Sequence, residues 1–426
     1  MKSWLARFGY STLLRALTPL YLLRLWWRGR REPLYRHALA QRLGLGYRTA
    51  APGALWLHAV SLGETRAASA LLDALRAQRP GLRLLLTHGT ATGREAGRSL
   101  LREGDTHCWL PWDTPGAVRR FLRHHRPAVG VLMETEIWPN LLHAADVERV
   151  PMVLANARLS GKSQAKGERI AALVRPVAAT LAAVLAQTEA DARRLRSFGA
   201  KRVQVCGNLK FDLSPAPKLL ARGLQWRQLL TRPVVLAAVT REGEEMPLLQ
   251  CWATLDAPRP LLLLVPRHPQ RFDAVADMAA DFGFELRRRS GWTALPPPEA
   301  LAAEVWLGDS MGEMPLYYAA ADVALLGGSF GRFGGQNLIE AAACGCPVVM
   351  GPHTYNFSEA ADLSLAAGAA LRVAGIEDGV AQAVALARNP ARLDWVQRAS
   401  GFAAAHRGAA ERMAREVLEV AGPRLG

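Results

Sequence analysis

The segment Ala128-Val-Gly-Val-Leu-Met-Glu-Thr-Glu-Ile-Trp-Pro-Asn140 combines an apolar run, two carboxylates and a helix start. Its apolar part, Ala128–Met133, is typical of a strand that is buried on both faces. Proline is favoured in the first turn of a helix, so Trp138-Pro139 predicts that a helix begins there. A buried strand followed directly by a helix is the repeating unit of parallel α/β sheets.

The same alternation continues on both sides of this segment. In the first half of the chain, helical stretches separate the apolar runs Ala54–Val60, Leu82–Thr87, Pro151–Ala155, Ala183–Ala186 and Val203–Cys206. A second series contains Val234–Val239, Leu261–Val265, Val305–Leu307, Val323–Leu326 and Pro347–Met350. Single helices between strands imply parallel pairing, so the sequence predicts two doubly wound, Rossmann-like α/β domains.

The limits of these domains follow from composition. A Ser-Pro-Ala-Pro stretch at 214–217 marks the junction, so we expect a first domain at 49–213 and a second at 214–426. The second would include the alanine-rich helical tail from Ile376 to Val420, and residues 1–48 would form a separate segment. Two such domains facing one another would place a ligand in a central cleft, at the carboxyl ends of both sets of strands.

The overall composition excludes several classes of protein. Half of the 426 residues are hydrophobic and 21% are charged, which excludes wholesale disorder and a small disulfide scaffold. The five cysteines include no C-x-x-C pair, so a disulfide framework or a four-cysteine zinc site is not expected and a reducing compartment is favoured. No cluster of His, Cys, Asp and Glu has metal-ligand spacing, and we therefore expect a metal-independent site.

The basic N-terminal segment suggests a membrane surface. Residues 1–48 contain ten Lys/Arg against the single acid Glu32. The stretch from Trp4 to Trp27 is mostly apolar, but its longest uncharged run, Ala16–Leu23, has only eight residues, whereas a spanning helix needs about 20. We expect an interfacial helix whose arginines meet anionic headgroups on the cytoplasmic side. A helix packed on its own domain is the alternative, and no motif accompanies the charge to support nucleic-acid binding.

Polar residues follow the predicted strands of the first half. Glu64 begins a helix, where a carboxylate either interacts with the positive end of the helix dipole or acts as a general base. Glu134 directly follows Met133 and is expected to face the cleft, whereas Glu136 fits ordinary helix N-terminal chemistry. Lys210 lies at the domain junction, where it either assists an anionic leaving group or pairs with Asp212.

The second half carries features of anion binding. Arg267 projects from a strand end, and the segment Gly327–Asn337 is a glycine-rich loop that opens a helix. Such a loop either cradles a phosphate or is a plain turn. Glu340 is placed to accept ribose hydroxyls. Neither the P-loop pattern nor the dinucleotide fingerprint is present, so ATP hydrolysis and NAD binding lose support.

Taken together and in order, these motifs resemble those of the 3-deoxy-D-manno-octulosonic acid (Kdo) transferases of lipid A assembly. Those are enzymes of the bacterial inner membrane with the GT-B glycosyltransferase fold. The matching stretches are His58–Glu64, Pro111–Pro115, Met133–Asn140, Asn156–Ser160, Gly207–Asp212, Glu242–Glu245, Pro266–Pro269, Gly308–Glu313, Gly327–Glu340 and Gly351–Phe357, with the basic aromatic Arg24–Arg30.

The resemblance implies a role for each matching site residue. Glu64 would be the proton acceptor, and Glu134 and Lys210 would stabilise the transition state. The first domain would bind the acceptor and the second the donor, whose CMP moiety would be held by Pro266, Arg267, Met311, Gly312, Glu313, Asn337, Leu338, Ile339 and Glu340. Gln336 and Arg241 stand where the family has histidines, so the roles of those histidines do not carry over.

The resemblance also implies the reaction. It is the inverting transfer of Kdo from CMP-Kdo to a lipid A precursor (lipid IVA), without metal or other cofactor, at the cytoplasmic face of the inner membrane. One alternative is another GT-B enzyme of the same pathway that uses a UDP-sugar. The other, from a different class, is a non-catalytic membrane-associated scaffold, which would be indifferent to loss of Glu64.

Overall fold

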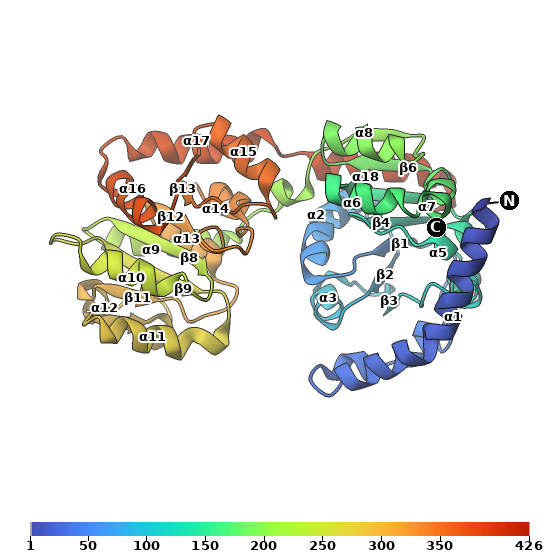
Figure 1. Cartoon of the computed structure of the whole chain (residues 1–426), viewed down its shortest axis with the longest axis horizontal. Coiled ribbons are helices and arrows are strands. Elements are labelled where there is room, and N and C mark those ends of the chain that lie inside the picture. Colours follow the sequence, from blue (N-terminus) through green and yellow to red (C-terminus); the bar gives the residue numbers. More distant parts are fainter. Residues whose placement is uncertain (1, 426) are drawn as a thin grey trace. The chain divides into compact units, whose positions relative to one another are not determined.

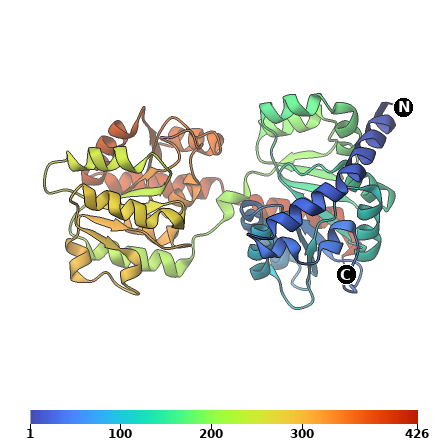
Figure 2. The ribbon, with the colours of Figure 1, turned by 60° about the horizontal axis from the view of Figure 1, so that its bottom comes forward.

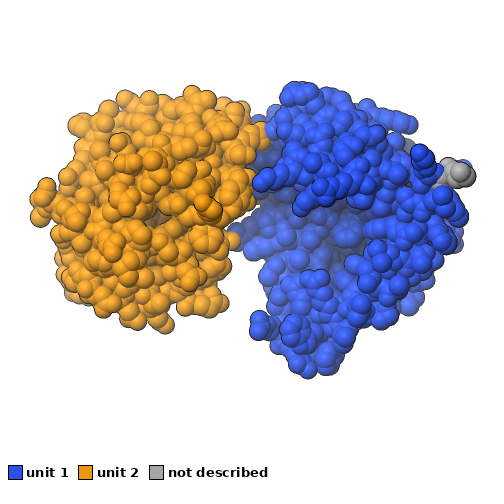
Figure 3. All heavy atoms as spheres, viewed as in Figure 1, with its two compact units in different colours: residues 1–212, 407–426 blue, residues 213–406 orange. Residues whose placement is uncertain are grey.

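The computed structural model describes residues 2–425 and divides into two compact units. The first contains the chain up to Asp212 together with the residues from Arg407 onward, and the second is Leu213–His406. Figure 3 colours these units blue and orange. The predicted junction is therefore correct to within one residue, but the prediction of a single second domain at 214–426 is wrong.

The end of the chain returns to the first unit because of its apolar face. Helix α18 (Ala409–Ala421) buries Ala409, Met413, Ala414 and Val417 in the same core as the first-unit strands. The basic segment 1–48 also belongs to the first unit and is not separate from it.

The first unit is built on a parallel sheet of seven strands (Figure 1). Their order is β3-β2-β1-β4-β5-β6-β7, and every neighbouring pair is parallel. The bounds are β1 Leu55–His58, β2 Leu84–His88, β3 Thr106–Trp109, β4 Val129–Met133, β5 Met152–Ala157, β6 Ala183–Ala186 and β7 Val203–Val205. The central strands are buried along their whole length, as their continuous apolar sequences require.

Helices cover both faces of this sheet. They are α1 Lys2–Arg28, α2 Leu62–Gln78, α3 Ala91–Gly97, α4 Pro115–His125, α5 Pro139–Val147, α6 Gly161–Glu168, α7 Ala171–Ala178, α8 Glu189–Ser197 and α18. A short 3-10 turn, η4 (Leu209–Asp212), ends the first pass of the chain through this unit.

The second unit repeats the plan. Its seven parallel strands have the order β10-β11-β9-β8-β12-β13-β14. The bounds are β8 Val234–Thr240, β9 Leu261–Pro266, β10 Leu286–Arg288, β11 Val305–Leu307, β12 Val323–Leu326, β13 Val348–Met350 and β14 Ala370–Arg372. The helices are α9 Pro217–Leu229, α10 Glu245–Ala253, α11 Phe272–Asp281, α12 Pro298–Ala302, α13 Met314–Ala320, α14 Leu338–Ala343, α15 Ser358–Ala366, α16 Ile376–Arg388 and α17 Arg392–Ala405.

In each sheet the chain crosses once from one half of the sheet to the other, and we call this crossing the reversal point. In the first unit the chain winds from β1 to β3 in one direction and then continues from β4 on the other side of β1. In the second unit the corresponding reversal point lies between the neighbouring strands β8 and β12. Ligands of open α/β sheets bind at the carboxyl ends of the strands beside such a point. The loops after β1, β4, β8 and β12 are therefore the places to look for a site.

Helix α1 packs against the first unit and exposes apolar residues on its other side. In Figure 2 it crosses the near side of that unit. Its own Leu14 and Leu25 are buried against the rest of the unit, and its Tyr21 stacks on Trp112 with ring centroids 4.0 Å apart. Its exposed large apolar residues are Trp4, Leu5, Phe8, Leu13, Leu17, Leu20, Leu23, Trp26 and Trp27. No helix within residues 2–425 is long and apolar enough to cross a membrane.

Candidate active site

Glu64 occupies the first turn of α2, directly after β1. The Ser61 hydroxyl accepts a hydrogen bond from the Glu64 amide and donates one to Glu64 Oε1, 2.9 Å away. The Val60 amide donates to Glu64 Oε2, also at 2.9 Å. This is a variant of the Ser-x-x-Glu capping box in which the glutamate accepts from the amide before the N-cap, and it fixes the carboxylate in one orientation. Glu64 thus lies at the positive end of the α2 dipole, as its structural interpretation expects, and both of its oxygens keep further lone pairs for a substrate proton.

Glu134 lies at the end of β4, on the other side of the reversal point. Its φ is +58°, a left-handed conformation that costs a non-glycine residue roughly 1–3 kcal/mol. The backbone is held there because the Glu134 amide donates to the Ala155 carbonyl of β5, at 2.9 Å. Strain of this kind persists where the surroundings determine the conformation, and it is concentrated at functional sites.

Lys210 lies on η4, beyond the end of β7. Its half-buried side chain has a lowered pKa, because burial disfavours the ammonium and Arg158 repels it, while Glu134 and Glu64 oppose the shift. The Asp212 carboxylate accepts hydrogen bonds from the amides of Gly408 and Ala410, and so it caps α18. These contacts give Asp212 a structural role, which is to cap α18.

Glu136 and Lys210 each lie within range of the charges of Glu64 and Glu134 at this reversal point. Burial raises the pKa of Glu64, and the charge of Glu134 raises it further, against the hydrogen bonds from Val60 and Ser61. Burial, then the charges of Glu64 and Glu134, raise the pKa of Glu136 to about 7. The three predicted residues Glu64, Glu134 and Lys210 are thus brought together. Glu136 joins them, although its sequence position had indicated only a helix start.

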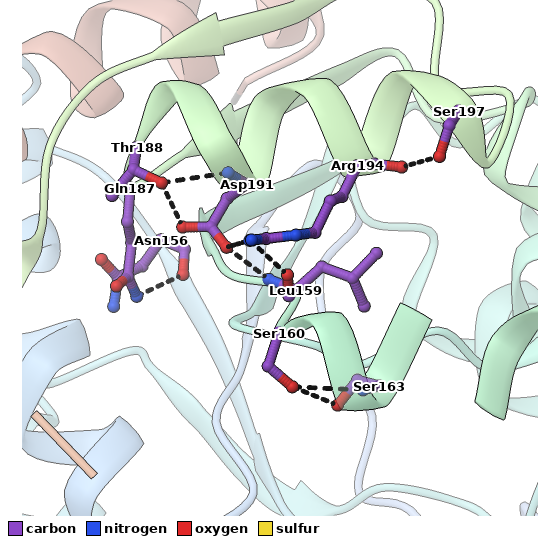
Figure 4. A network of polar contacts seen from close by, with 9 residues as sticks. All are labelled: Asn156, Leu159, Ser160, Ser163, Gln187, Thr188, Asp191, Arg194 and Ser197. Carbon is purple, nitrogen blue, oxygen red and sulfur yellow. Dashed lines mark hydrogen bonds and ion pairs between the residues drawn. The ribbon is translucent and has the colours of Figure 1, made fainter. Parts of the chain in front are cut away.

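The loop after β5 supports η4. Asn156 is fully buried with φ +52°, and its Oδ1 accepts from the Leu209 amide at 3.1 Å. Its carbonyl accepts from Gln187 Nε2 at 2.9 Å, and Asn156 Nδ2 has no hydrogen-bond partner among the described residues. Figure 4 shows how α8 holds the rest of this loop. Asp191 accepts from the Leu159 amide at 2.8 Å, and Arg194 donates to the Leu159 carbonyl at 3.0 Å.

In the second unit, cationic groups gather after β8 and β9. Pro266 ends β9 and is buried, while Arg267 is exposed and its amide donates to the Thr240 carbonyl. Burial, then the charges of Arg241, Arg267 and Arg271, lower the pKa of His268. Such a cluster attracts an anion such as a phosphate.

The glycine-rich loop after β12 differs from the predicted open phosphate cradle. The buried Glu244 carboxylate accepts hydrogen bonds from the amides of Gly328, Phe330 and Gly331, at 2.8, 3.2 and 3.0 Å. An internal carboxylate thus occupies the first part of the loop. Any phosphate contact from this loop is left to its later residues, Arg332–Asn337. The role of Glu244 was missed because sequence spacing does not reveal which carboxylate fills a set of amides.

Arg241 and Gln336, the two departures from the family pattern, are neighbours. A Cβ placed on Gly328 would lie 3.3 Å from Gln336 Nε2 and 3.5 Å from Arg241 Cγ. The Arg241 guanidinium also lies over the Phe333 ring, 4.5 Å from its centroid. The residue before Gly328, Gly327, must also be a glycine, because a Cβ at position 327 would lie 2.4 Å from the Val239 carbonyl oxygen.

The predicted Met-Gly-Glu turn lies after β11. Met311 is 68% exposed and Gly312 has φ +81°. Both Glu313 oxygens are engaged within the unit, one by Arg289 at 2.9 Å and the other by the Ser310 hydroxyl at 2.6 Å. Glu313 therefore holds the turn in place, and Met311 is the member of the turn whose side chain is open to a ligand.

The last predicted residues begin α14. Asn337 caps this helix by accepting from the Ile339 amide at 3.2 Å. Leu338 and Ile339 are each 1% exposed, so their side chains belong to the core and only backbone groups could face a ligand. Glu340 is half-buried.

Comparison with known proteins shows the family. A family model described as "3-Deoxy-D-manno-octulosonic-acid transferase (kdotransferase)" matches residues 37–213. A 3-deoxy-D-manno-octulosonic acid transferase of Bordetella pertussis is 45% identical over 423 residues, which cover 96% of this chain and 98% of the relative. The chain belongs to the Kdo transferase family. A transferase of the same description from Haemophilus influenzae is 36% identical over 89% of the chain and 90% of its own length.

Solved structures agree with the fold expected of a Kdo transferase. A glycosyltransferase from Rickettsia africae matches with a TM-score of 0.57 at 11% identity, over 87% of this chain and 99% of its own. A UDP-GlcNAc 2-epimerase from Neisseria meningitidis matches with a TM-score of 0.56 at 15% identity, over 86% and 98%. These likenesses support the two-domain GT-B fold alone. Within residues 2–425, no group of three or more His, Cys, Asp or Glu side chains could hold a metal ion.

Proposed function

We propose that this Kdo transferase moves Kdo from CMP-Kdo to a hydroxyl of a tetraacylated lipid A precursor, lipid IVA, with inversion at the anomeric carbon. The observation that carries the proposal is the gathering of Glu64, Glu134 and Lys210 at the β1/β4 reversal point. An inverting transfer needs one base and stabilisation of the charges that develop around it, and this group of side chains can supply both.

Each residue has a role in the proposed step. Glu64 removes the proton of the acceptor hydroxyl, whose oxygen attacks the anomeric carbon of Kdo. The bond from that carbon to the phosphate oxygen breaks, and its electron pair leaves with CMP. The raised pKa of Glu64 makes it a stronger base than an exposed carboxylate. The ammonium of Lys210 and the fixed charge of Glu134 stabilise the separated charges.

The second unit is proposed to bind the donor. Arg241 and Arg267 belong to the cationic cluster after β8 and β9, and an arginine fork binds a phosphate through two parallel hydrogen bonds. Met311 would contact the nucleotide with its exposed side chain, and Glu340 would accept ribose hydroxyls. The proposed step uses no metal, because Glu64 supplies the base and the arginines neutralise the departing phosphate.

The proposed location is the cytoplasmic face of the inner membrane. The support is the outer side of α1, where leucines and tryptophans are exposed beside arginines. Apolar side chains at the level of the headgroups and arginines facing anionic lipid are the two contributions that hold an interfacial helix. Binding to anionic vesicles should weaken as salt is added, since surface electrostatics are screened.

The test is a donor panel. Full-length protein in detergent is incubated with lipid IVA and either CMP-Kdo or a set of UDP-sugars. The lipid products are then identified by mass spectrometry. The proposal expects a Kdo-bearing lipid and free CMP from CMP-Kdo alone. Turnover of a UDP-sugar instead would favour the alternative GT-B activity, and no turnover of any donor would favour the non-catalytic scaffold.

A further inference from the structure

Two neighbouring hollows lie along α1, at the side where it meets α4 and α5. The larger, of about 560 Å³, is lined by Arg15, Thr18 and Leu22 of α1 and by Thr114, Gly116 and Arg120 at the start of α4. This volume lies in the range of small-molecule sites, ~300–1,000 Å³. The smaller, of about 190 Å³, is lined by Trp4, Arg7, Phe8 and Arg15 of α1, with Arg119 and Val147 opposite. Arg15 lines both hollows, so they adjoin one another.

The charges around the hollows are all of one sign. Arg7, Arg15, Arg119 and Arg120 contribute guanidinium groups, and no described acidic residue lines either hollow. Among the described residues, Arg120 donates to the Leu43 carbonyl at 2.5 Å, and none of the four arginines forms an ion pair. The first turn of α4 adds the positive end of its helix dipole, since Thr114 makes no side-chain cap there. The lining therefore favours an anion.

The rest of the lining is apolar. Trp4, Phe8 and Val147 are between 55% and 58% exposed beside the smaller hollow. They continue into the exposed leucines on the outer side of α1. Guanidinium groups next to exposed aromatic and aliphatic side chains are complementary to a molecule with an anionic head and a hydrocarbon tail.

The hollows are a fixed feature, because hydrogen bonds fasten α1 to the rest of the first unit along them. The Tyr10 hydroxyl donates to Asp113 Oδ2 at 2.9 Å, and the Ser11 hydroxyl donates to Asn140 Oδ1 at 2.9 Å. Further along the helix, Trp112 Nε1 donates to the Leu14 carbonyl at 3.2 Å. Asp113 is the acid near the hollows, but it is buried and also accepts from the amides of Asn140 and Leu141. It holds α1 and does not neutralise the arginines.

We propose that these hollows bind one acidic phospholipid of the membrane, with its phosphate between Arg15 and Arg120 and its acyl chains beside Trp4 and Phe8. The proposal deepens the proposed membrane association and rests on it. A seated lipid would fix the orientation of the first unit at the bilayer, which a diffuse attraction between charges does not do. Arginine is suited to this task because its planar fork matches a phosphate bidentately.

The test measures lipid binding in detergent, away from any bilayer. Full-length protein is titrated with phosphatidylglycerol or with zwitterionic phosphatidylcholine, and bound lipids are counted by native mass spectrometry. We expect phosphatidylglycerol to bind and phosphatidylcholine not to bind. The Arg15→Gln/Arg120→Gln variant should lose at least tenfold in affinity for phosphatidylglycerol. Because Arg120 also contacts Leu43, a second variant, Arg7→Gln/Arg119→Gln, tests the neighbouring hollow without breaking that hydrogen bond.

The matched control is Arg24→Gln/Arg30→Gln, which removes the same charge at the same end of the chain outside both hollows. Equal losses in the control, equal binding of phosphatidylcholine, or no bound lipid in the wild type would each overturn the proposal. A raised KM for the lipid acceptor in the first variant would assign the hollows to the acceptor instead. Failure of the protein to sediment with vesicles, while lipid binding in detergent persists, would contradict the membrane association and leave the site intact.

Discussion

The charge of Glu64 acts on Glu136, and the pKa of Glu136 reports on that interaction. Burial and the Glu64 charge raise the pKa of Glu136 from 4.5 to about 7, so the folded protein keeps this proton across that range while the unfolded chain loses it. Unfolding therefore releases a proton, and this residue makes the free energy of unfolding fall as the pH rises from about 4.5 to about 7.

We predict that Glu64→Gln lowers the pKa of Glu136, because one of the two nearby negative charges is removed. NMR titration of selectively labelled glutamate carboxyls, with Glu136→Gln for assignment, measures the shift. Glu377→Gln, in the first turn of α16 in the other unit, is the control and should leave the titration unchanged. An unchanged Glu136 pKa in Glu64→Gln would show that the two carboxylates are not neighbours.

Asn156 tests how η4 and Lys210 are positioned. Asn156→Ala removes the acceptor of the Leu209 amide and leaves that buried donor unpaired, which typically costs about 1–3 kcal/mol. We predict that turnover falls at least tenfold while the KM for CMP-Kdo stays within about twofold, because Lys210 would lose its support and the donor contacts would not. Gln164→Ala removes a weaker, exposed hydrogen bond of the same unit, to Ser197 at 3.4 Å, and should leave both constants unchanged. Equal effects of the two changes would exclude this positioning role.

Residue patterns predicted the site only in part. Glu64, Glu134 and Lys210 could be found because each follows an apolar run, and the ends of parallel strands meet at one edge of a sheet. The partner of the glycine-rich loop could not, since Glu244 fills those amides through a contact across more than eighty residues. The pKa of Glu136 was equally invisible, because burial is a property of the folded chain.

At the scale of elements, the central strands were predictable and several edge strands were not. The predicted strands are all present, most with ends shifted by one or two residues. The strands that were missed, β3, β10 and β14, lie at sheet edges, where one side meets solvent and polar residues are tolerated. Leu286-Arg-Arg288, for instance, carries no apolar run at all. Apolar periodicity identifies buried strands, and it fails where burial is partial.

Helix α1 gives a prediction at this scale, because one of its sides is exposed to solvent and the other packs against the rest of the first unit. Leu13, Leu17 and Leu20 are exposed, whereas Leu14 is buried against the first unit. We predict that Leu13→Gln/Leu17→Gln/Leu20→Gln reduces sedimentation with anionic vesicles at least tenfold and leaves the melting temperature nearly unchanged, since glutamine preserves helix propensity.

The control for α1 is Leu14→Ala, which should do the reverse. Truncating a buried leucine typically costs about 2–5 kcal/mol of stability, and vesicle binding by the folded fraction should remain. Vesicle binding that is unaffected by the triple change would contradict an interfacial helix.

At the scale of the whole molecule, the path of the last twenty or so residues could not be read from the sequence. An alanine-rich amphipathic helix fits either sheet, and its placement depends on contacts such as the Asp212 cap and the hydrogen bond from Arg412 to the Cys206 carbonyl. The chain thus joins the two units twice, after Asp212 and before Arg407. The proposed function divides the work between these units, with the base in the first and donor binding in the second.

This division predicts that CMP binding responds differently to a substitution in the second unit, Arg267→Ala, and to one in the first, Glu64→Gln. Arg267→Ala should weaken CMP binding, because a hydrogen bond to a charged group contributes about 1.5–3 kcal/mol, or roughly 10- to 150-fold in affinity. Unchanged affinity in calorimetric titration would remove Arg267 from the donor site.

Glu64→Gln should leave CMP binding intact, because it lies in the other unit and keeps the shape of the capping side chain. The most direct measurement of the central claim is therefore the turnover of CMP-Kdo with lipid IVA by Glu64→Gln, alongside its CMP affinity and melting temperature. A general base contributes about 10²–10⁴ in rate, so we predict a loss of at least about a hundredfold in turnover with affinity within about twofold of wild type. If the variant is folded and retains more than about a tenth of wild-type turnover, Glu64 is not the base and the proposed mechanism is wrong.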